Sequence, residues 1–181
     1  MTDLSLLAHE LEVSDRTLRR AAARGTVRCV RRGQRLELPV QEALYLQRRW
    51  PLLQTLVGEL RTVANVRLAV LFGSTAREDD DGRSDVDLLV RLAKRGLSAR
   101  ALVLDRLEDA TGRRVQIAEV EDTNSVLLAD VLRDGRVLVD RDDDWSRLVA
   151  KKKLVLALAE KKRAALDLEV WSALDDLLAT T

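Results

Sequence analysis

The chain has 181 residues, of which 46% are hydrophobic, 34% charged and 3% aromatic, and its formal net charge is +1. This balance predicts a water-soluble globular protein of one or two modules, and the single cysteine and single histidine exclude an intrachain disulfide or a Cys/His zinc cluster. The first residues carry acids, and no apolar run reaches membrane-spanning length, so we expect a cytoplasmic protein without a membrane partner.

The first fifty residues predict a small helical module with a hairpin. Helical apolar spacing over residues 4–11 indicates a first helix, and Ser14 as N-cap with Gly25 as stop indicates a second. Residues 26–31 and 35–38 suit two short strands, and Pro39 opens another helix. The run SDRTLRRAAARGTVRCVRRGQRLELPVQEALYLQRR resembles the excisionase and MerR type of winged helix-turn-helix, which implies a DNA-binding module over residues 1–50.

Arginine is concentrated in this module, because residues 16–35 contain eight arginines and neither Asp nor Glu. The four-residue spacing on the second helix predicts an exposed basic strip that suits a major groove, and the hairpin arginines would reach phosphates or a minor groove. A merely solvated helix is the alternative. A winged helix acting on a palindromic operator also favours a homodimer. The predicted DNA contacts are Arg16, Arg19, Arg20, Arg24, Arg28, Arg31, Arg32 and Arg35.

Beyond Pro51, which predicts a break, the pattern indicates a linking helix over residues 51–65 and then alternating strands and helices over residues 66–144. Such alternation predicts an α/β or α+β sheet domain. Residues 145–181 form a helical C-terminal extension with an apolar stripe, for which packing on its own domain and a partner surface are both open. The expected elements of the sheet domain are strand 66–72, a helix from Ser74, strand 86–90, helix 99–110, strand 115–120, helix 125–133 and strand 137–139.

Two aspartates interrupt an apolar strand in the segment LFGSTAREDDDGRSDVDLLV. Residues two apart on a strand point to the same side, so Asp85 and Asp87 would present neighbouring carboxylates, which Mg²⁺ can bind together with substrate phosphates. Gly73 and Ser74 lie where a strand gives way to a helix, and backbone N–H groups at such a corner bind phosphate. The pattern therefore predicts a nucleoside triphosphate held between the two.

The Gly73-Ser74 pair followed by Asp85-Val86-Asp87 resembles the motif of the nucleotidyltransferase superfamily that includes polymerase β. The compact chain and the run LRDGRVLVD make residues 66–140 most similar to the minimal nucleotidyltransferases of bacterial toxin–antitoxin pairs. The resemblance implies a mixed α+β sheet flanked by helices and Mg²⁺-dependent transfer of AMP from ATP. It further implies a partner protein as acceptor, a toxin of the HEPN type or another.

The resemblance also implies a third carboxylate on the adjacent strand, where this sequence has Gln116. An amide cannot accept a proton, and Glu119 would need a β-bulge to take its place. Two alternatives to an active enzyme follow. One is a catalytically inert regulator or antitoxin that binds DNA, and the other is an adenylyltransferase for a small molecule of the aminoglycoside type, for which operator DNA would have no use.

Overall fold

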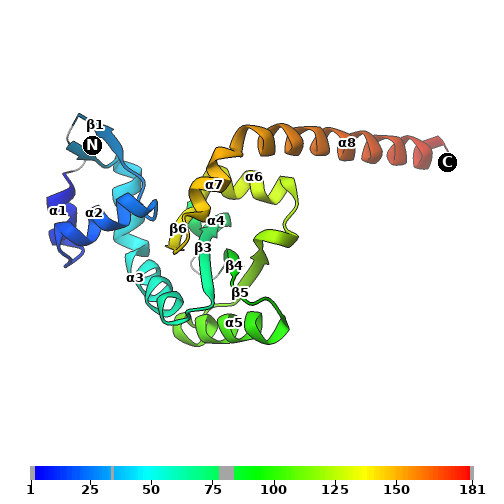
Figure 1. The fold of residues 1–181 in the computed structure, drawn as a ribbon. Helices are drawn as coiled ribbons and strands as arrows, with labels where there is room; N and C mark the ends of the chain where they lie inside the picture. The colour runs from blue at the N-terminus through cyan, green and yellow to red at the C-terminus, as the bar shows by residue number, and fades with distance from the viewer. Residues whose placement is uncertain (1–2, 34, 78–83, 180–181) are drawn as a thin grey trace.

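The structure, a computed structural model, describes residues 3–33, 35–77 and 84–179, with the side chains of all of these except residues 35 and 169–179. Its front part is mostly helical, with one small hairpin (Figure 1). In chain order the elements of the front part are α1 (Leu4–Glu10), α2 (Asp15–Arg24), β1 (Val30–Arg32), β2 (Arg35–Glu37) and α3 (Val40–Thr62).

The rest of the described chain forms one mixed sheet with helices, which agrees with the expected α+β class. Its elements are β3 (Val66–Phe72), α4 (Gly73–Arg77), β4 (Val86–Leu92), α5 (Leu97–Thr111), β5 (Val115–Glu119), the 3₁₀ turn η1 (Val120–Asp122), α6 (Ser125–Asp134), β6 (Arg136–Asp140), α7 (Asp144–Ala150) and α8 (Lys152–Ala179). The strand order is β5-β4-β3-β6. β3 is antiparallel to both of its neighbours, whereas β4 and β5 are parallel.

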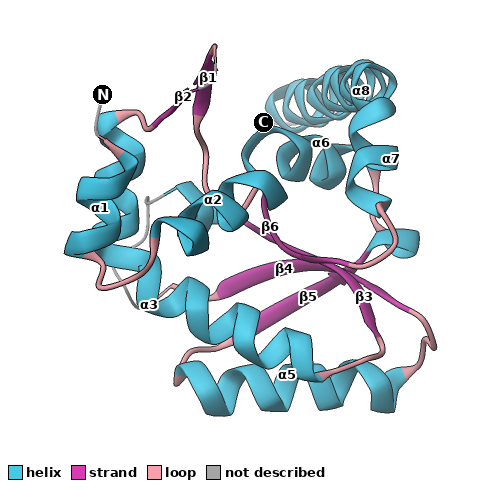
Figure 2. Ribbon diagram, turned by 60° about the vertical axis from the view of Figure 1, so that its left-hand side comes forward, coloured by secondary structure: helices cyan, strands magenta, loops and turns pink. Residues whose placement is uncertain are grey.

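Alternating side chains of the strands enter two apolar layers on the two faces of this sheet. Ala69 and Leu71 pack in the larger layer, together with α3 and α5, while Leu68 and Val70 pack in the second layer with α6, α7 and α8. Figure 2 shows this division of the helices between the faces. The larger layer continues without interruption into the front part. Within the described ranges, none of the helices combines the length and apolar character that crossing a bilayer requires.

The caps expected for the second helix are confirmed. The Ser14 side chain accepts a hydrogen bond from the Thr17 N–H, and Gly25 closes α2 in the left-handed conformation at φ 85°. These two residues satisfy backbone groups at the helix ends that would otherwise lack partners. Leu18 and Ala21 are the buried residues of α2, so its remaining faces are available to solvent.

The break expected at Pro51 is absent, because α3 runs continuously from Val40 to Thr62. Proline removes one backbone hydrogen bond inside a helix, but buried side chains lie on both sides of it, among them Trp50 and Leu53. Their packing holds both halves of the helix in line and outweighs the local preference. Residues 51–62 of the expected linking segment are therefore the second half of α3.

The first hairpin strand is also shorter than expected, since it begins at Val30 instead of residue 26. Residues ahead of it are engaged by the sheet domain. The Val137 N–H of β6 donates to the Gly25 carbonyl at 3.2 Å, and the Thr26 hydroxyl donates to the Val137 carbonyl. Gly25 and Thr26 therefore bond to β6, and pairing with β2 begins only at Val30.

Candidate functional site

Gly73 and Asp87 meet where β3 ends. Phe72 is the register partner of Asp87 in the antiparallel β3–β4 pair, and Gly73 follows at φ 73°. A Cβ atom on residue 73 would lie 2.3 Å from Asp87 Oδ2, closer than real Cβ contacts come. Glycine is therefore required twice, for its backbone conformation and for the carboxylate beside it. The glycine-serine corner and the acid pair thus lie together, with Ser74 as the second residue of α4.

Asp85, Asp87 and Gln116 lie side by side on neighbouring strands. Asp87 and Gln116 are register partners in the parallel β4–β5 pair, so their side chains leave the same face of the sheet. Asp85 immediately precedes β4, and its Oδ2 accepts a hydrogen bond from Gln116 Nε2 at 2.5 Å. The position that would complete a carboxylate triad is thus filled by an amide that donates to one of the two acids.

Glu119 lies away from this group. It pairs in register with Val90, and the β4–β5 register runs from Val86 to Val90 without a shift, so the bulge that would turn Glu119 toward the acids is not present. Its carboxylate instead accepts a hydrogen bond from Arg95 Nε at 2.7 Å. We find no role for it beside Asp85 and Asp87.

Two nearby carboxylates make this corner electrostatically unfavourable without a cation. Burial, and after it the negative charge of Asp85, raises the pKa of Asp87, while Arg77 opposes the rise. The described residues contain no group of three or more His, Cys, Asp or Glu side chains that could hold a metal ion. A pair of carboxylates nevertheless suits Mg²⁺, which commonly takes one or two of them and fills its shell with phosphate and water. The donor set present therefore fits the ion that the sequence predicts.

A network that sequence reasoning missed fixes the backbone next to the acids. Thr75 is fully buried in α4, and its hydroxyl donates to the Asp85 carbonyl at 3.2 Å. Arg113 donates from Nε to the Ser84 carbonyl at 3.0 Å and from Nη2 to the Thr75 hydroxyl at 3.2 Å. In the sequence, Arg113 is only a basic residue near the start of a predicted strand. That pattern is too common to indicate a role.

A buried ion pair connects the front part to α4. Arg136 and Glu42 are 2% and 5% exposed, and two hydrogen bonds of 2.6 and 2.9 Å join the guanidinium to the carboxylate. Arg136 Nε also donates to the Ala76 carbonyl of α4 at 2.9 Å. The guanidinium lies 3.6 Å from the ring centroid of Tyr45, whose pKa burial raises to about 12 and whose hydroxyl donates to the Thr75 carbonyl.

The arginines of the front part divide into exposed and engaged groups. Arg28 is half-buried and donates to the Asp134 carbonyl, and burial, reinforced by Arg136, lowers its pKa, so it faces the sheet domain. Arg32 lies 3.5 Å from Glu37 across the hairpin. The side chain of Arg35 lies outside the described part. Among the eight predicted DNA contacts, the exposed ones are Arg16, Arg19, Arg20 and Arg24 on α2 and Arg31 and Arg32 on β1.

A protein-family model described as "Polymerase beta, Nucleotidyltransferase" matches residues 54–144, about half of the chain. No curated protein matches.

Several solved structures are similar to this chain. One is described as tri-AMPylated Shewanella oneidensis HEPN toxin in complex with MNT antitoxin, at 20% identity and TM-score 0.51, covering 66% of this chain and 98% of that chain. Another, from Shewanella oneidensis, matches at 17% identity and TM-score 0.50, covering 66% and 97%. A toxin–antitoxin structure with AMP-PNP has 22% identity, TM-score 0.48 and coverage of 70% and 98%. At these identities the first two show a shared fold.

Proposed function

Since the match covers half of its length, this chain belongs to the polymerase beta nucleotidyltransferase family, and we propose that it transfers AMP from ATP to a hydroxyl group of a partner protein. The observation that carries the proposal is the contact between the glycine-serine corner and the acid pair, where Gly73 leaves room only for the Asp87 carboxylate. This arrangement brings a candidate phosphate contact and candidate metal ligands to one point.

Each part of the corner has a proposed role. Gly73 and Ser74 contact the phosphates of the nucleotide through backbone N–H groups at the corner where β3 gives way to α4. Asp85 and Asp87 hold Mg²⁺, which when bound would neutralise phosphate charge and favour loss of the hydroxyl proton. Thr75 and Arg113 act as positioning residues, because they hold the backbone of residues 84 and 85 against α4.

In the transfer, the acceptor oxygen forms a bond to the α-phosphorus, the bond from that phosphorus to pyrophosphate breaks, and the hydroxyl proton passes to water. The Gln116 amide cannot take this proton. Loss of a general base typically lowers a rate by about 10²–10⁴. We therefore propose slow transfer, which is consistent with modification of a partner made in the same cell and not with rapid turnover of a metabolite.

One observation favours a second candidate function. The neutral Gln116 amide donates a hydrogen bond to Asp85, so it occupies one oxygen of the acid pair and adds no negative charge where a third carboxylate would add one. An inert nucleotidyltransferase fold that works as a DNA-binding regulator or antitoxin is consistent with this arrangement.

We propose that the front part binds operator DNA through α2. Its arginines Arg16 and Arg19 are exposed and belong to a basic segment without acids. Guanidinium groups that neutralise DNA phosphates release counterions, so the affinity would fall steeply with salt.

We propose that α8 contributes to binding the partner protein. Its buried residues Val155 and Ala159 pack in the layer with α6, whereas Leu154, Leu158 and Leu168 are exposed. In Figure 1 this helix extends away from the rest of the molecule toward the C-terminus. Exposed leucines on a projecting helix are typical of an interaction surface. A toxin of the kind described for the similar Shewanella oneidensis complex, or another protein encoded beside this chain, is the partner we propose.

The experiment incubates the full chain with α-labelled ATP, Mg²⁺ and the protein encoded beside it. We expect slow labelling of the partner that disappears in Asp85→Ala/Asp87→Ala and rises in Gln116→Asp. Glu119→Gln is the matched control, because this residue lies outside the corner and should leave the rate unchanged. Labelling by Gln116→Asp alone would support the inert regulator, and absence of both labelling and Mg²⁺-dependent ATP binding would overturn the enzymatic proposal.

A further inference from the structure

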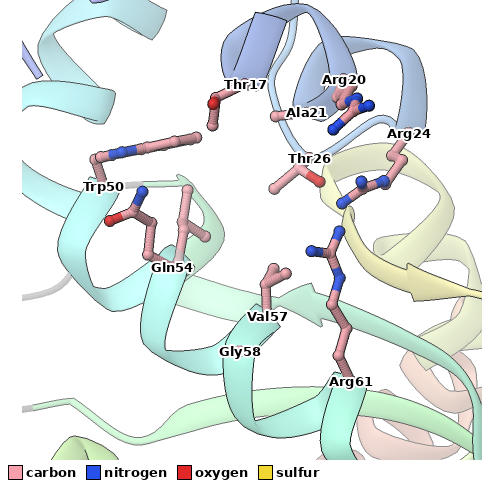
Figure 3. A pocket seen from close by; sticks show the side chains of 11 residues that line it. Thr17, Arg20, Ala21, Arg24, Thr26, Trp50, Gln54, Val57, Gly58 and Arg61 are labelled. Atoms are coloured by element: carbon pink, nitrogen blue, oxygen red, sulfur yellow. The ribbon is translucent and has the colours of Figure 1, made fainter. Parts of the chain in front are cut away.

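A pocket of about 310 Å³ lies between α2 and α3, apart from the acid pair. Arg20 and Arg24 of α2 and Arg61 of α3 line it, and Figure 3 shows their three guanidinium groups gathered on one side. The opposite side is formed by Trp50, with Gln54 beside it. Positive charge and an aromatic wall therefore line the same open pocket.

Among the described residues, no carboxylate compensates the positive charge of this pocket. No Asp or Glu is among the residues that line it. In the described ranges, none of the three guanidinium groups forms an ion pair or hydrogen bond. Arg20 and Arg24 are four residues apart on one helix, a spacing at which like charges repel and destabilise. A bound anion would remove this repulsion.

The apolar side carries a second, independent indication of a ligand. Trp50 is 6% exposed, and its indole Nε1 is buried without a hydrogen-bond partner among the described residues. A buried donor left unsatisfied is unfavourable by about 1–3 kcal/mol, so such groups in native proteins usually have an acceptor. Leu53 and Val57 continue the wall beside the indole. The pocket therefore pairs a surface for a ring system with an orphaned donor.

From these features we infer that the pocket binds a nucleoside phosphate without a metal ion. Guanidinium groups form bidentate hydrogen bonds with phosphate, and three of them suit a ligand of more than one negative charge. The base would lie along Trp50 and Leu53, where an acceptor on its edge meets the indole N–H. The volume is in the range of small-molecule sites. Neither Asp85 nor Asp87 takes part, so this site is separate from the proposed transferase corner.

Isothermal titration of the full chain with AMP and with ATP, in EDTA and low salt, tests this inference. EDTA removes the Mg²⁺ that the acid pair would need, so binding in its presence reports on the arginine pocket. We expect saturable binding of both nucleotides by the wild type and by Asp85→Ala/Asp87→Ala. Arg24→Gln and Arg61→Gln should each weaken it by about tenfold or more, since each removes charge-assisted hydrogen bonds.

Gly58 offers a blocking variant that does not disturb packing. It lines the pocket on α3, and a Cβ at this position would meet no atom within 4 Å. Gly58→Ala should bind nucleotide as the wild type does. It is the control that a side chain at this position is compatible with folding, because alanine favours a helix. Gly58→Glu should abolish binding by placing a carboxylate among the arginines, and its isostere Gly58→Gln should weaken binding less.

Several outcomes would overturn the inference. These are no nucleotide binding in EDTA, binding that persists in both arginine variants, and loss of all binding in Asp85→Ala/Asp87→Ala. A fourth is that Arg24→Gln and Arg61→Gln weaken binding of a DNA duplex while free nucleotides never bind, which would assign the cluster to DNA. Failure of labelling in the transferase assay would leave the pocket intact, because that assay depends on the acid pair.

Discussion

A Gly73→Ala substitution would drive a methyl group into the Asp87 carboxylate and destabilise the folded protein. The new Cβ would lie 2.3 Å from Oδ2 and 3.2 Å from Cγ of Asp87. Rotating that side chain away from its preferred conformation is unfavourable by about 0.5–1.5 kcal/mol. An alanine at φ 73° adds about 1–2 kcal/mol of backbone strain. We expect a loss of roughly 1.5–3.5 kcal/mol in the free energy of unfolding.

Gly112→Ala is the matched control for the backbone term. Gly112 has φ 63° and nothing within 4 Å of its Cβ position, so alanine there adds strain without a clash. Urea denaturation should show that Gly73→Ala loses about 0.5–1.5 kcal/mol more than Gly112→Ala, because only Gly73→Ala also displaces a side chain. Most of this excess should disappear in an Asp87→Ala background, because that mutation removes the carboxylate that the new methyl group would contact. Equal losses at the two glycines, or an excess that persists without the carboxylate, would refute the proposed contact.

Three further predictions concern charge. Asp87 has a raised pKa in the folded protein, so its ionisation opposes folding. Asp87→Asn should therefore raise the melting temperature of the metal-free protein near neutral pH. This gain should shrink as the pH falls through the folded-state pKa of Asp87. Melting curves across pH test it, and a pH-independent gain would contradict it. Arg136→Met should lose about 3–5 kcal/mol in urea denaturation because Glu42 stays buried without its partner, whereas Arg136→Met/Glu42→Leu should lose less. If the single variant proves the milder one, the pair does not act as described. Arg16→Gln should reduce the salt slope of DNA binding by about one, measured by fluorescence anisotropy, and an unchanged slope would remove this residue from the interface.

Patterns local in sequence predicted most elements of the fold. The strands of the mixed sheet were located to within one or two residues, because apolar runs such as residues 66–72 end at turn residues. The caps at Ser14 and Gly25 followed from residue type alone. Pro51 misled because helix-breaking is a local tendency, whereas the continuity of α3 depends on burial of Trp50 and its neighbours against distant segments.

For the site, the motif predicted the nearness of Gly73 and Asp87, but their roles and those of the other site residues stay predictions. The family resemblance indicated Gln116 as the matching position on the adjacent strand, whereas its hydrogen bond to Asp85 could not be predicted from the sequence. Nothing local indicates that Arg136, within the apolar run RVLVD, is buried against Glu42, 94 positions earlier. The long-range partner of a charged residue cannot be predicted from one sequence, because the pairing leaves no pattern in the residues next to either partner.

The hydrogen bonds from β6 to Gly25 and Thr26 have a consequence for how the chain could be divided. β6 is an outer strand of the sheet, and the front part satisfies backbone groups on its open side. Unpaired groups on such a strand recruit strands from other molecules and start aggregation. The front part therefore acts as a built-in shield against intermolecular strand pairing. A fragment cut to the sheet alone would expose the Val137 backbone groups together with the larger apolar layer, and both changes favour aggregation.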